Sequence, residues 1–388
     1  CHRQKIKTVH TPIVGISEFR VCQTGETMSI KNVYYEITSF ENLLRADKNC
    51  ASQHTDKWEI IEFRRNLEEH LLNLRDRLRR LDIPPVRYRS FLVFDPKVRK
   101  VIYTDYTTKV IQRAIYDVLY EPIQRGFITD TYACVTDRGQ HEAVRRLASW
   151  FHEVNGRGQY AYYYKFDVRK FFYRIDHEVL MNIIKKKISD KYTVELMRYY
   201  MCSTQRPFGM PLDGNHLTIT DDEMLWDKGI AIGGGLSHMI GNMYLDQLDQ
   251  YAKRTLGIKK YIRFADDIII TDTDKGKLKE YGKLLTQFLN EKLLLEFNDR
   301  CALRPNRCGC EFVGCVIYPD HVLLRKSTTL RMKKNLRRVA EKYKKYEVSF
   351  DYCKQVAASY AGMLEHVDGN RFKDKLWEDF VLTHNMEE

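Results

Sequence analysis

The chain has 388 residues, of which 44% are hydrophobic and 30% charged, a balance that is typical of globular proteins and excludes a largely disordered chain. This length predicts two or three subdomains built around more than one core. The net charge of +12 favours a polyanionic partner, with nucleic acid as the first candidate and a basic surface kept for solubility as the alternative.

The N-terminal part of the chain predicts helices on either side of one basic hairpin. Residues 1–38 contain only short strand-like pieces, and no role follows from them. Apolar residues recur at helical spacing through residues 56–82, before a pair of prolines. Two β-rich runs in residues 88–105 flank an Asp-Pro-Lys turn signal, which predicts a hairpin. Residues 108–127 then predict a helix that ends at Pro122.

The remainder of the chain alternates strands and helices. Aromatic and β-branched residues predict a strand over 160–168, and residues 261–272 predict two strands joined by a turn. Residues 203–229 are rich in turn-forming residues and are interpreted as a surface insertion. Residues 229–256 predict a glycine loop that leads into an amphipathic helix, and residues 310–326 predict a hairpin. Residues 130–150 predict a loop that enters a helix. Further helical patterns occupy residues 177–188, 278–295 and 327–388, with a dense run of Lys and Arg at 331–345.

Cysteines and apolar runs bear on location and metal binding. Ten cysteines without a secretory pattern predict reduced thiols and a cytoplasmic protein. No apolar run reaches the roughly 18 residues of a transmembrane helix, so no membrane partner is expected. Cys301, Cys308, Cys310 and Cys315 form a cluster, but their spacing is not that of a standard zinc site, and buried free cysteines are the favoured interpretation.

Two adjacent carboxylates, Asp266 and Asp267, precede a run of three isoleucines that is expected to be buried. Neighbouring buried carboxylates repel each other, and a divalent cation relieves that repulsion. Asp167 ends another predicted strand. Together the three aspartates supply hard oxygen ligands for two Mg²⁺ ions that act on an attacking 3′ hydroxyl and a leaving pyrophosphate. A plain acidic turn is the alternative.

Three motifs in order resemble those of reverse transcriptases. They are KFDVRKFF at residues 165–172, FADD at 264–267 and FVG at 312–314, and the resemblance extends from about residue 39 to the end. It implies an α+β, right-hand polymerase with fingers, a palm with a mostly antiparallel sheet, and a helical thumb. The implied divisions are 1–38 as an extension of unknown role, 39–160 as fingers with the first part of the palm, 161–318 as palm with the insertion at about 203–229, and 319–388 as thumb.

Five further segments resemble the reverse transcriptases of diversity-generating retroelements, namely residues 39–46, 90–102, 131–141, 232–238 and 312–327. In that group an isoleucine replaces the glutamine that most other reverse transcriptases have before the long palm helix, and Ile232 matches it. His238 departs from the pattern, because the group has glutamine there. The resemblance implies error-prone copying of a noncoding template RNA into cDNA. Two alternatives stay open: an antiphage-defence enzyme that makes DNA from an associated noncoding RNA, and an inactive polymerase fold that serves as an RNA-binding scaffold.

The resemblance also implies roles for individual residues and partners. Asp167, Asp266 and Asp267 would be catalytic and would hold the Mg²⁺ ions with the backbone carbonyl of Val168, and Mn²⁺ would be able to substitute. The implied nucleotide-binding residues are Arg99, Lys97, Phe172, Ile232 and Gly233, with Phe172 as a steric gate against a ribose 2′-OH. The implied primer and template contacts are Phe312, Gly314, Arg325, Lys326, Lys333 and Lys334. Expected partners are the template RNA, a DNA primer and its product, dNTPs, and a small basic helical accessory protein that forms a ring.

Overall fold

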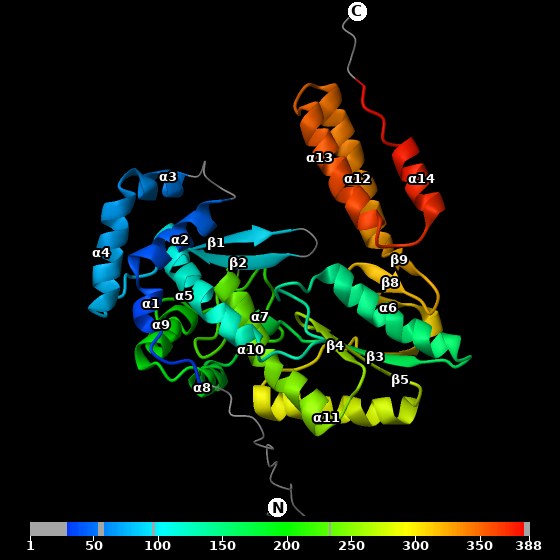
Figure 1. Cartoon of the computed structure of the whole chain (residues 1–388), viewed down its shortest axis with the longest axis horizontal. Coiled ribbons are helices and arrows are strands. Elements are labelled where there is room, and N and C mark those ends of the chain that lie inside the picture. The colour runs from blue at the N-terminus through cyan, green and yellow to red at the C-terminus, as the bar shows by residue number, and fades with distance from the viewer. Residues whose placement is uncertain (1–28, 53–57, 95–97, 233, 384–388) are drawn as a thin grey trace, which may run out of the picture.

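A computed structural model gives the structure of residues 29–52, 58–94, 98–232 and 234–383. These residues form antiparallel sheets of two, four and three strands, with helices around them (Figure 1). Lys97, Gly233 and residues 1–28 of the predicted extension lie outside the described residues. The N-terminal helices are α1 (Tyr34–Ile37), α2 (Phe40–Ala51), α3 (Trp58–Arg65), α4 (Leu67–Arg79), α5 (Tyr106–Gln124) and α6 (Gln140–Gly156).

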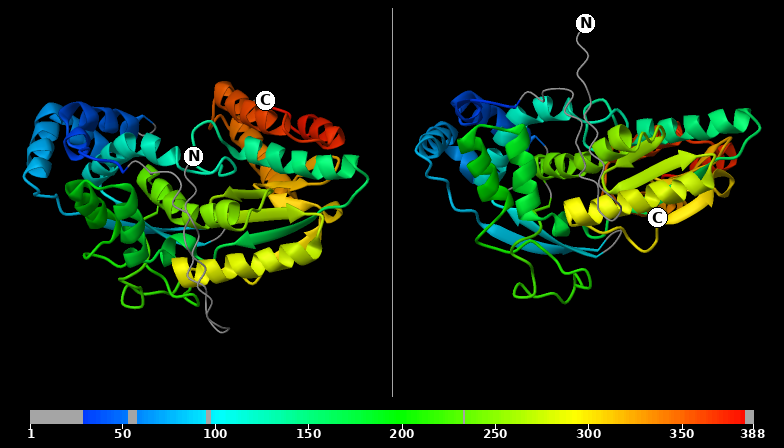
Figure 2. Two further views of the ribbon diagram at one scale, coloured as in Figure 1. Left: turned by 60° about the horizontal axis from the view of Figure 1, so that its bottom comes forward. Right: turned by 90° about the horizontal axis from the view of Figure 1, so that it is seen from below.

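The central sheet has the strand order β4–β5–β3–β6. Its strands are β3 (Tyr162–Asp167), β4 (Tyr261–Phe264), β5 (Asp267–Asp272) and β6 (Ala302–Pro305). Alternate residues of a strand face opposite sides of a sheet. Ile268 and Ile270 join the core shared with α11 (Lys275–Leu293), whereas Ile269 joins the core shared with α6. Helices therefore cover both faces (Figure 2), which explains the uninterrupted isoleucine run.

The helix that follows the glycine loop, α10 (Gly235–Gln250), is buried on nearly every side, so the prediction of an amphipathic helix was wrong. It packs against α5, α11 and α8 (His177–Lys187), and an enclosed helix needs no solvent-facing polar stripe. Its polar residues Asn242, Asp246 and Asp249 are buried as well. The neighbouring short elements are α7 (Phe171–Arg174), α9 (Lys191–Met201) and the π-helical turn η1 (Tyr251–Thr255).

The predicted hairpin is confirmed as β1 (Tyr88–Val93) paired with β2 (Arg99–Thr104). Residues 203–229 are turn-rich as predicted and contain no named helix or strand. However, they are not simply a surface insertion, because apolar side chains of the segment form a small core with the hairpin and with α7. This core contains Ile102, Tyr173, Phe208, Met210, Ile219, Met224 and Ala231.

The C-terminal part begins with a three-stranded meander and continues as three helices. The strands are β7 (Cys310–Phe312), β8 (Cys315–Ile317) and β9 (Val322–Leu324), so the segment predicted as a hairpin has one strand more. The helices are α12 (Lys326–Lys344), α13 (Phe350–Leu364) and α14 (Asn370–Glu378). They confirm the predicted helical C-terminus and stand apart from the N-terminal helices in Figure 1. No helix in the described part of the chain is both long and apolar enough to cross a membrane.

Three further expectations were wrong in detail. The single helix predicted over residues 56–82 is two helices, α3 and α4, because Asn66 adopts non-helical backbone angles of −125° and 53° between them. The helix predicted to stop at Pro122 continues to Gln124, where burial of Ile123 holds the last turn although proline offers no N–H. Residues 34–37 form helix α1 instead of a strand-like piece.

Candidate functional site

The three predicted aspartates meet at one end of the central sheet. Asp167, the last residue of β3, is the register partner of Asp267, the first residue of β5. Asp266 lies in the turn between β4 and β5, and its carbonyl accepts a 3.3 Å hydrogen bond from the N–H of Val168. The turn is tight because Ala265 has a φ of +54°, in the left-handed region that alanine rarely adopts. The structure thus brings Asp167, Val168, Asp266 and Asp267 together.

Burial and mutual repulsion govern the ionisation of these carboxyl groups. Burial, helped by the charge of Asp167, raises the pKa of Asp266 to about 6. Burial also raises the pKa of Asp267, although Lys165 opposes that rise with its ammonium group 3.0 Å from a carboxylate oxygen. Asp167 accepts a 2.6 Å hydrogen bond from the side-chain amide of Asn298. Each aspartate therefore has a distinct electrostatic environment.

Lys165 and Asn298 were missed by sequence reasoning. Lys165 lies two residues before Asp167 on the same strand, so strand alternation places both side chains on one face. That spacing was visible in the sequence. Asn298 lies far along the chain, and the pairing of residues 296–298 with residues 167–169 brings it to Asp167. No local sequence pattern predicts this pairing.

The chemistry of this donor set fits a hard divalent cation. Among the described residues, no three His, Cys, Asp or Glu side chains already stand in the arrangement of a metal site. The aspartates nevertheless offer several carboxylate oxygens from two paired strands, and carboxylate oxygen is the ligand type that Mg²⁺ prefers. Burial is the main cause of the raised pKa of Asp266, and a cation between the aspartates would offset both that burial and the added repulsion from Asp167.

The predicted nucleotide-binding residues differ in their surroundings. Arg99 is exposed at the start of β2, and its charge acts on Asp266 in the direction that lowers the pKa of that carboxyl. Phe172 is half-buried, with its ring centroid 5.8 Å from that of His238, whereas Phe171 is only 5% exposed in the core. Ile232 is half-buried and packs against the small core of residues 203–229. Of these side chains, Arg99 is the one whose charge acts on an aspartate, whereas Phe172 and Ile232 contact His238 and the small apolar core respectively.

The predicted primer and template residues lie at the meander and on α12. Phe312 is fully buried, and its ring meets Phe264 edge-on at 6.4 Å between centroids. Gly314 has a φ of +79°, and its carbonyl accepts a 2.9 Å hydrogen bond from the backbone N–H of Arg325. The Arg325 guanidinium pairs with Glu311 at 2.9 Å. This chain of contacts ties the meander turn to the start of α12 and to β4.

The lysines of α12 do not all face solvent. Lys326 and Lys334 are exposed. Lys333 is half-buried and lies over the ring of Phe372, 5.4 Å from its centroid, so part of its role is packing between α12 and α14.

The four clustered cysteines are not gathered into a metal-binding group among the described residues. Cys310 and Cys315 are buried on the paired strands β7 and β8, and Cys308 is exposed. The thiol of Cys301 lies 3.1 Å from the carbonyl of Asn298, on the side of the aspartates.

Comparisons with known proteins bear on this site. Residues 95–300, more than half of the chain, match the model of the family described as reverse transcriptase (RNA-dependent DNA polymerase). No curated protein matches the chain.

Similar solved structures include telomerases. Apo telomerase from Candida tropicalis is 10% identical with a TM-score of 0.46, and the match covers 76% of this chain and 62% of that one. A form truncated from the C-terminal domain is 12% identical with a TM-score of 0.44, covering 61% and 54%. Telomerase from Candida albicans in complex with a TWJ fragment of telomeric RNA is 11% identical with a TM-score of 0.45, covering 77% and 57%. The chain thus spans between 54% and 62% of the length of these structures.

Proposed function

The chain belongs to the reverse transcriptase (RNA-dependent DNA polymerase) family, and from this premise we propose that it copies a noncoding template RNA into cDNA. The family match, together with the helices and antiparallel sheets, confirms the predicted α+β right-hand polymerase fold. The observation that carries the proposal is the register of Asp167 with Asp267, with Asp266 in the adjoining turn.

Asp167, Asp266, Asp267 and the Val168 carbonyl would hold two Mg²⁺ ions, or Mn²⁺ in their place. Bound metal ions activate a 3′ hydroxyl and stabilise a leaving pyrophosphate. Lys165 favours the charged form of Asp267, and Asn298 fixes the orientation of the Asp167 carboxylate. These two side chains therefore prepare the carboxylates for cation binding.

Three side chains would select the incoming nucleotide. Arg99 is exposed, its charge acts on Asp266, and its planar guanidinium suits a triphosphate. The half-exposed ring of Phe172 would exclude a ribose 2′-OH, a role its buried neighbour Phe171 cannot share. Ile232 would line the pocket without the hydrogen bonds of a glutamine. Lys97 and Gly233 remain candidates for the same pocket.

Primer and template would lie along the meander and α12. Phe312 and Gly314 would support the primer end, and the basic side chains of α12 would contact phosphates, which gives affinity without sequence choice. We propose residues 39–160 as fingers with the first part of the palm, 161–318 as palm with an insertion at about 203–229, and 319–388 as thumb.

We place the enzyme in a diversity-generating retroelement, on the strength of Ile232 and the five resembling segments. This role predicts a structured template RNA and a ring of a small basic helical protein as partners, in a cytoplasmic setting that suits the ten cysteines. Genomic neighbours separate this role from antiphage defence: a template repeat with a variable target gene supports diversification, and a defence island supports immunity.

The deciding experiment is primer extension on an RNA template with Mg²⁺ and dNTPs, with the products sequenced. We expect extension by the wild type and loss to background in Asp266→Ala/Asp267→Ala. Asp272→Asn is the matched control, because this carboxylate lies at the far end of β5 and pairs with Lys277. A wild type that stays inactive with its native RNA and accessory protein would favour the RNA-binding scaffold.

A further inference from the structure

Strand β4 contains a charged side chain where its neighbours are apolar. Arg263 is fully buried and is one of the largest side chains in the molecule without exposure. Burying a guanidinium is unfavourable unless its charge is paired and its N–H groups are bonded. Arg263 lies three residues before Asp266, so its buried interactions affect the turn that carries the aspartates.

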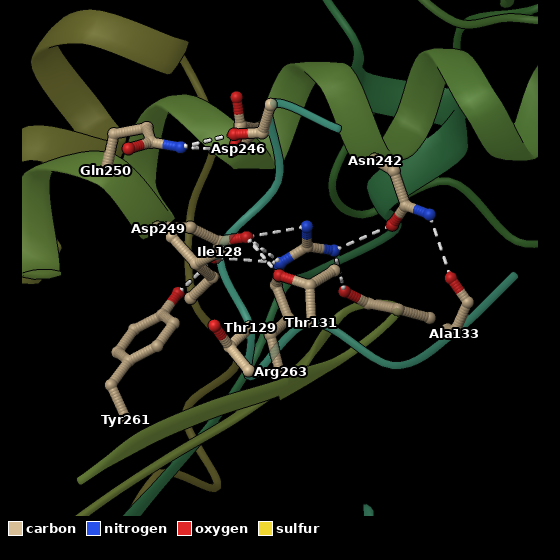
Figure 3. A network of polar contacts seen from close by, with 12 residues as sticks. Ile128, Thr129, Thr131, Ala133, Asn242, Asp246, Asp249, Gln250, Tyr261 and Arg263 are labelled. Atoms are coloured by element: carbon tan, nitrogen blue, oxygen red, sulfur yellow. Dashed lines mark hydrogen bonds and ion pairs between the residues drawn. The ribbon is translucent and has the colours of Figure 1, made fainter. Parts of the chain in front are cut away.

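The charge of Arg263 is neutralised by Asp249 on α10 (Figure 3). The Nε of Arg263 lies 2.8 and 2.9 Å from the two carboxylate oxygens, and its Nη2 lies 2.7 Å from one of them. Asp249 also accepts hydrogen bonds from the hydroxyl groups of Tyr261, at 2.6 Å, and Thr131, at 2.9 Å. The carboxylate is thus saturated, and it fixes one side of the guanidinium.

The other side of the guanidinium points to the turn that carries the aspartates. Its Nη1 donates a 3.0 Å hydrogen bond to the carbonyl of Ala265 and another of 3.0 Å to the side-chain oxygen of Asn242. Asn242 in turn donates to the carbonyl of Ala133 at 2.8 Å. Ala265 has left-handed backbone angles, which are unfavourable for alanine. The hydrogen bond from Arg263 therefore stabilises the turn at its strained residue.

The backbone of Arg263 is fixed as well. Its N–H donates to the carbonyl of Asp130 at 2.9 Å, and its carbonyl accepts from the N–H of Tyr132 at 3.0 Å. Side chain and backbone therefore join β4, α10 and residues 130–133 around the turn, and the guanidinium has little freedom to move.

We propose that Arg263 is a positioning residue for Asp266 and Asp267: it clamps the Ala265 carbonyl and so keeps the two carboxylates in register with Asp167. The inference rests on the proposed polymerase function and adds a residue that acts through the turn without touching substrate. Groups that orient metal ligands commonly change metal affinity or activity by about 10- to 100-fold when removed.

The test separates the clamp from the buried ion pair. Arg263→Met alone leaves the Asp249 carboxylate buried without its cation. Part of any loss of activity or Mn²⁺ binding would then come from misfolding. The double variant Arg263→Met/Asp249→Asn removes both buried charges, so no carboxylate is left without its cation. It also lacks the hydrogen bond to the Ala265 carbonyl, and therefore tests that bond. Arg263→Lys keeps the charge but lacks the forked donors. Tyr261→Phe is the control, because it removes a hydrogen bond to Asp249 and leaves the turn alone.

Each variant is assayed for primer extension and for Mn²⁺ binding. Binding is followed by the electron paramagnetic resonance signal of free Mn²⁺, with an RNA template, a dideoxy-terminated primer and the matching dNTP, so that no turnover occurs. We expect the double variant to melt within a few degrees of the wild type. Its Mn²⁺ dissociation constant should rise and its kcat should fall by about 10- to 100-fold. KM for dNTP should change less than about twofold. Tyr261→Phe should match the wild type in Mn²⁺ affinity and kcat, although it loses a buried hydrogen bond and with it some thermal stability.

The outcomes distinguish the two proposals. Wild-type Mn²⁺ affinity and kcat in the folded double variant would overturn the positioning role and leave the polymerase function standing. A wild type that binds Mn²⁺ but never extends a primer, while the double variant binds Mn²⁺ weakly, would contradict the polymerase function and support the clamp. A wild type that does neither contradicts both.

Discussion

At the scale of single residues, the apolar side chain of Ile232 predicts inaccurate copying. Ile232 is half-buried against the small core of residues 203–229 and has no hydrogen-bonding group to offer a base pair. A glutamine of similar length at this position would supply an amide that holds the geometry of the pair. Accuracy would then depend on the identity of the side chain at position 232.

We therefore expect Ile232→Gln to lower the error frequency opposite template adenine, with smaller changes opposite the other bases. Sequencing of cDNA made on a defined RNA template measures this spectrum. Ile232→Leu is the control, because it changes shape without adding an amide. Equal error spectra for Ile232→Gln and the wild type would remove the assigned role of this residue and weaken the retroelement assignment with it.

At the scale of elements, residues 203–229 connect the hairpin to the loop that follows Asp167. Lys100, next to Arg99 on β2, pairs with Asp221 at 2.9 Å, and Asp221 also pairs with Arg206 at 2.9 Å. On the other side, the ammonium of Lys170 donates to the carbonyls of Pro211, at 2.9 Å, and Gly214. The segment predicted as an insertion thus bridges the proposed fingers and the proposed catalytic strand.

This bridge predicts that Asp221→Asn raises KM for dNTP by about two- to fivefold while kcat stays within about twofold, because β2, which carries Arg99, loses the ion pair of Lys100 whereas the aspartates lose no contact. The magnitude follows from the modest strength of partly exposed ion pairs. Steady-state incorporation kinetics measure it. Lys100→Met should give the same change, and the double variant no more than either one. Glu223→Gln, on the same segment and bonded to Thr220, is the control. Additive effects of the two substitutions would contradict the bridge.

A second pair of elements, α6 and the loop between α13 and α14, meets through two histidines. The ring centroids of His141 and His366 are 3.9 Å apart. Burial, followed by the neighbouring His366 and Arg145, lowers the pKa of His141 from its ordinary value of 6.5, and Glu142 opposes this. The folded protein then binds a proton at His141 less readily than the unfolded chain, so this group reduces stability as the pH falls below about 6.5.

We expect the change in melting temperature between pH 7.5 and pH 5.5 to be less destabilising in His141→Asn than in the wild type. Scanning calorimetry at both pH values measures the difference, and comparing two proteins cancels the contribution of the other titrating groups. His152→Asn, on the same helix, is the control. The same pH dependence in His141→Asn and the wild type would mean that protonation of His141 does not change the stability of the fold.

Local sequence patterns correctly predicted the helices and strands that are determined by residues close together in the sequence. The β1–β2 hairpin, the strands around the Asp266–Asp267 turn and the C-terminal helices followed from alternation, turn residues and helical spacing. Strand β6 was missed, because it is short, ends in Pro305 and pairs only with β3 at the edge of the sheet.

Interactions set by tertiary register could not be predicted in the same way. Asn298 reaches Asp167, and Arg263 reaches Asp249, only after the strands and α10 have packed. A single sequence shows a charged residue in an apolar strand, but it does not show which residue neutralises that charge in the folded protein. The carboxylates of the site, and Lys165 two residues before Asp167, were therefore open to prediction from the sequence, whereas Asn298 and the partners of Arg263 were not.

At the scale of the whole molecule, the net charge of +12 bears on how nucleic acid is held. Exposed lysines and arginines gather on α12, including Lys334, Arg337 and Arg338. A second group, Lys275, Lys279 and Lys283, is exposed on α11, across the central sheet (Figure 1). Neutralising phosphates releases counterions, so binding weakens with salt in proportion to the number of phosphates neutralised.

We expect RNA–DNA duplex affinity to fall with salt, and the triple variant Lys334→Gln/Arg337→Gln/Arg338→Gln to flatten the log–log slope by about 0.9 for each phosphate that the variant no longer neutralises. Fluorescence anisotropy at several salt concentrations measures the slope. Lys275→Gln/Lys279→Gln/Lys283→Gln removes the same charge from α11 and should leave the slope nearly unchanged. Equal flattening in both variants would assign the salt dependence to overall charge and not to α12.

The clamp proposed around the aspartate turn also constrains how this chain can be recombined with a relative. Asn242, Asp249 and Arg263 all fall within residues 242–263, whereas Thr131 contributes a hydroxyl to Asp249, and Ala133 a backbone carbonyl, from outside that segment. A crossover between positions 249 and 263 would combine one parent's buried arginine with the other parent's helix, and leave a charge stranded in the hybrid core. Moving residues 242–267 as one block carries the ion pair and the turn together, so shuffled libraries should retain breakpoints on either side of this segment and lose those inside it.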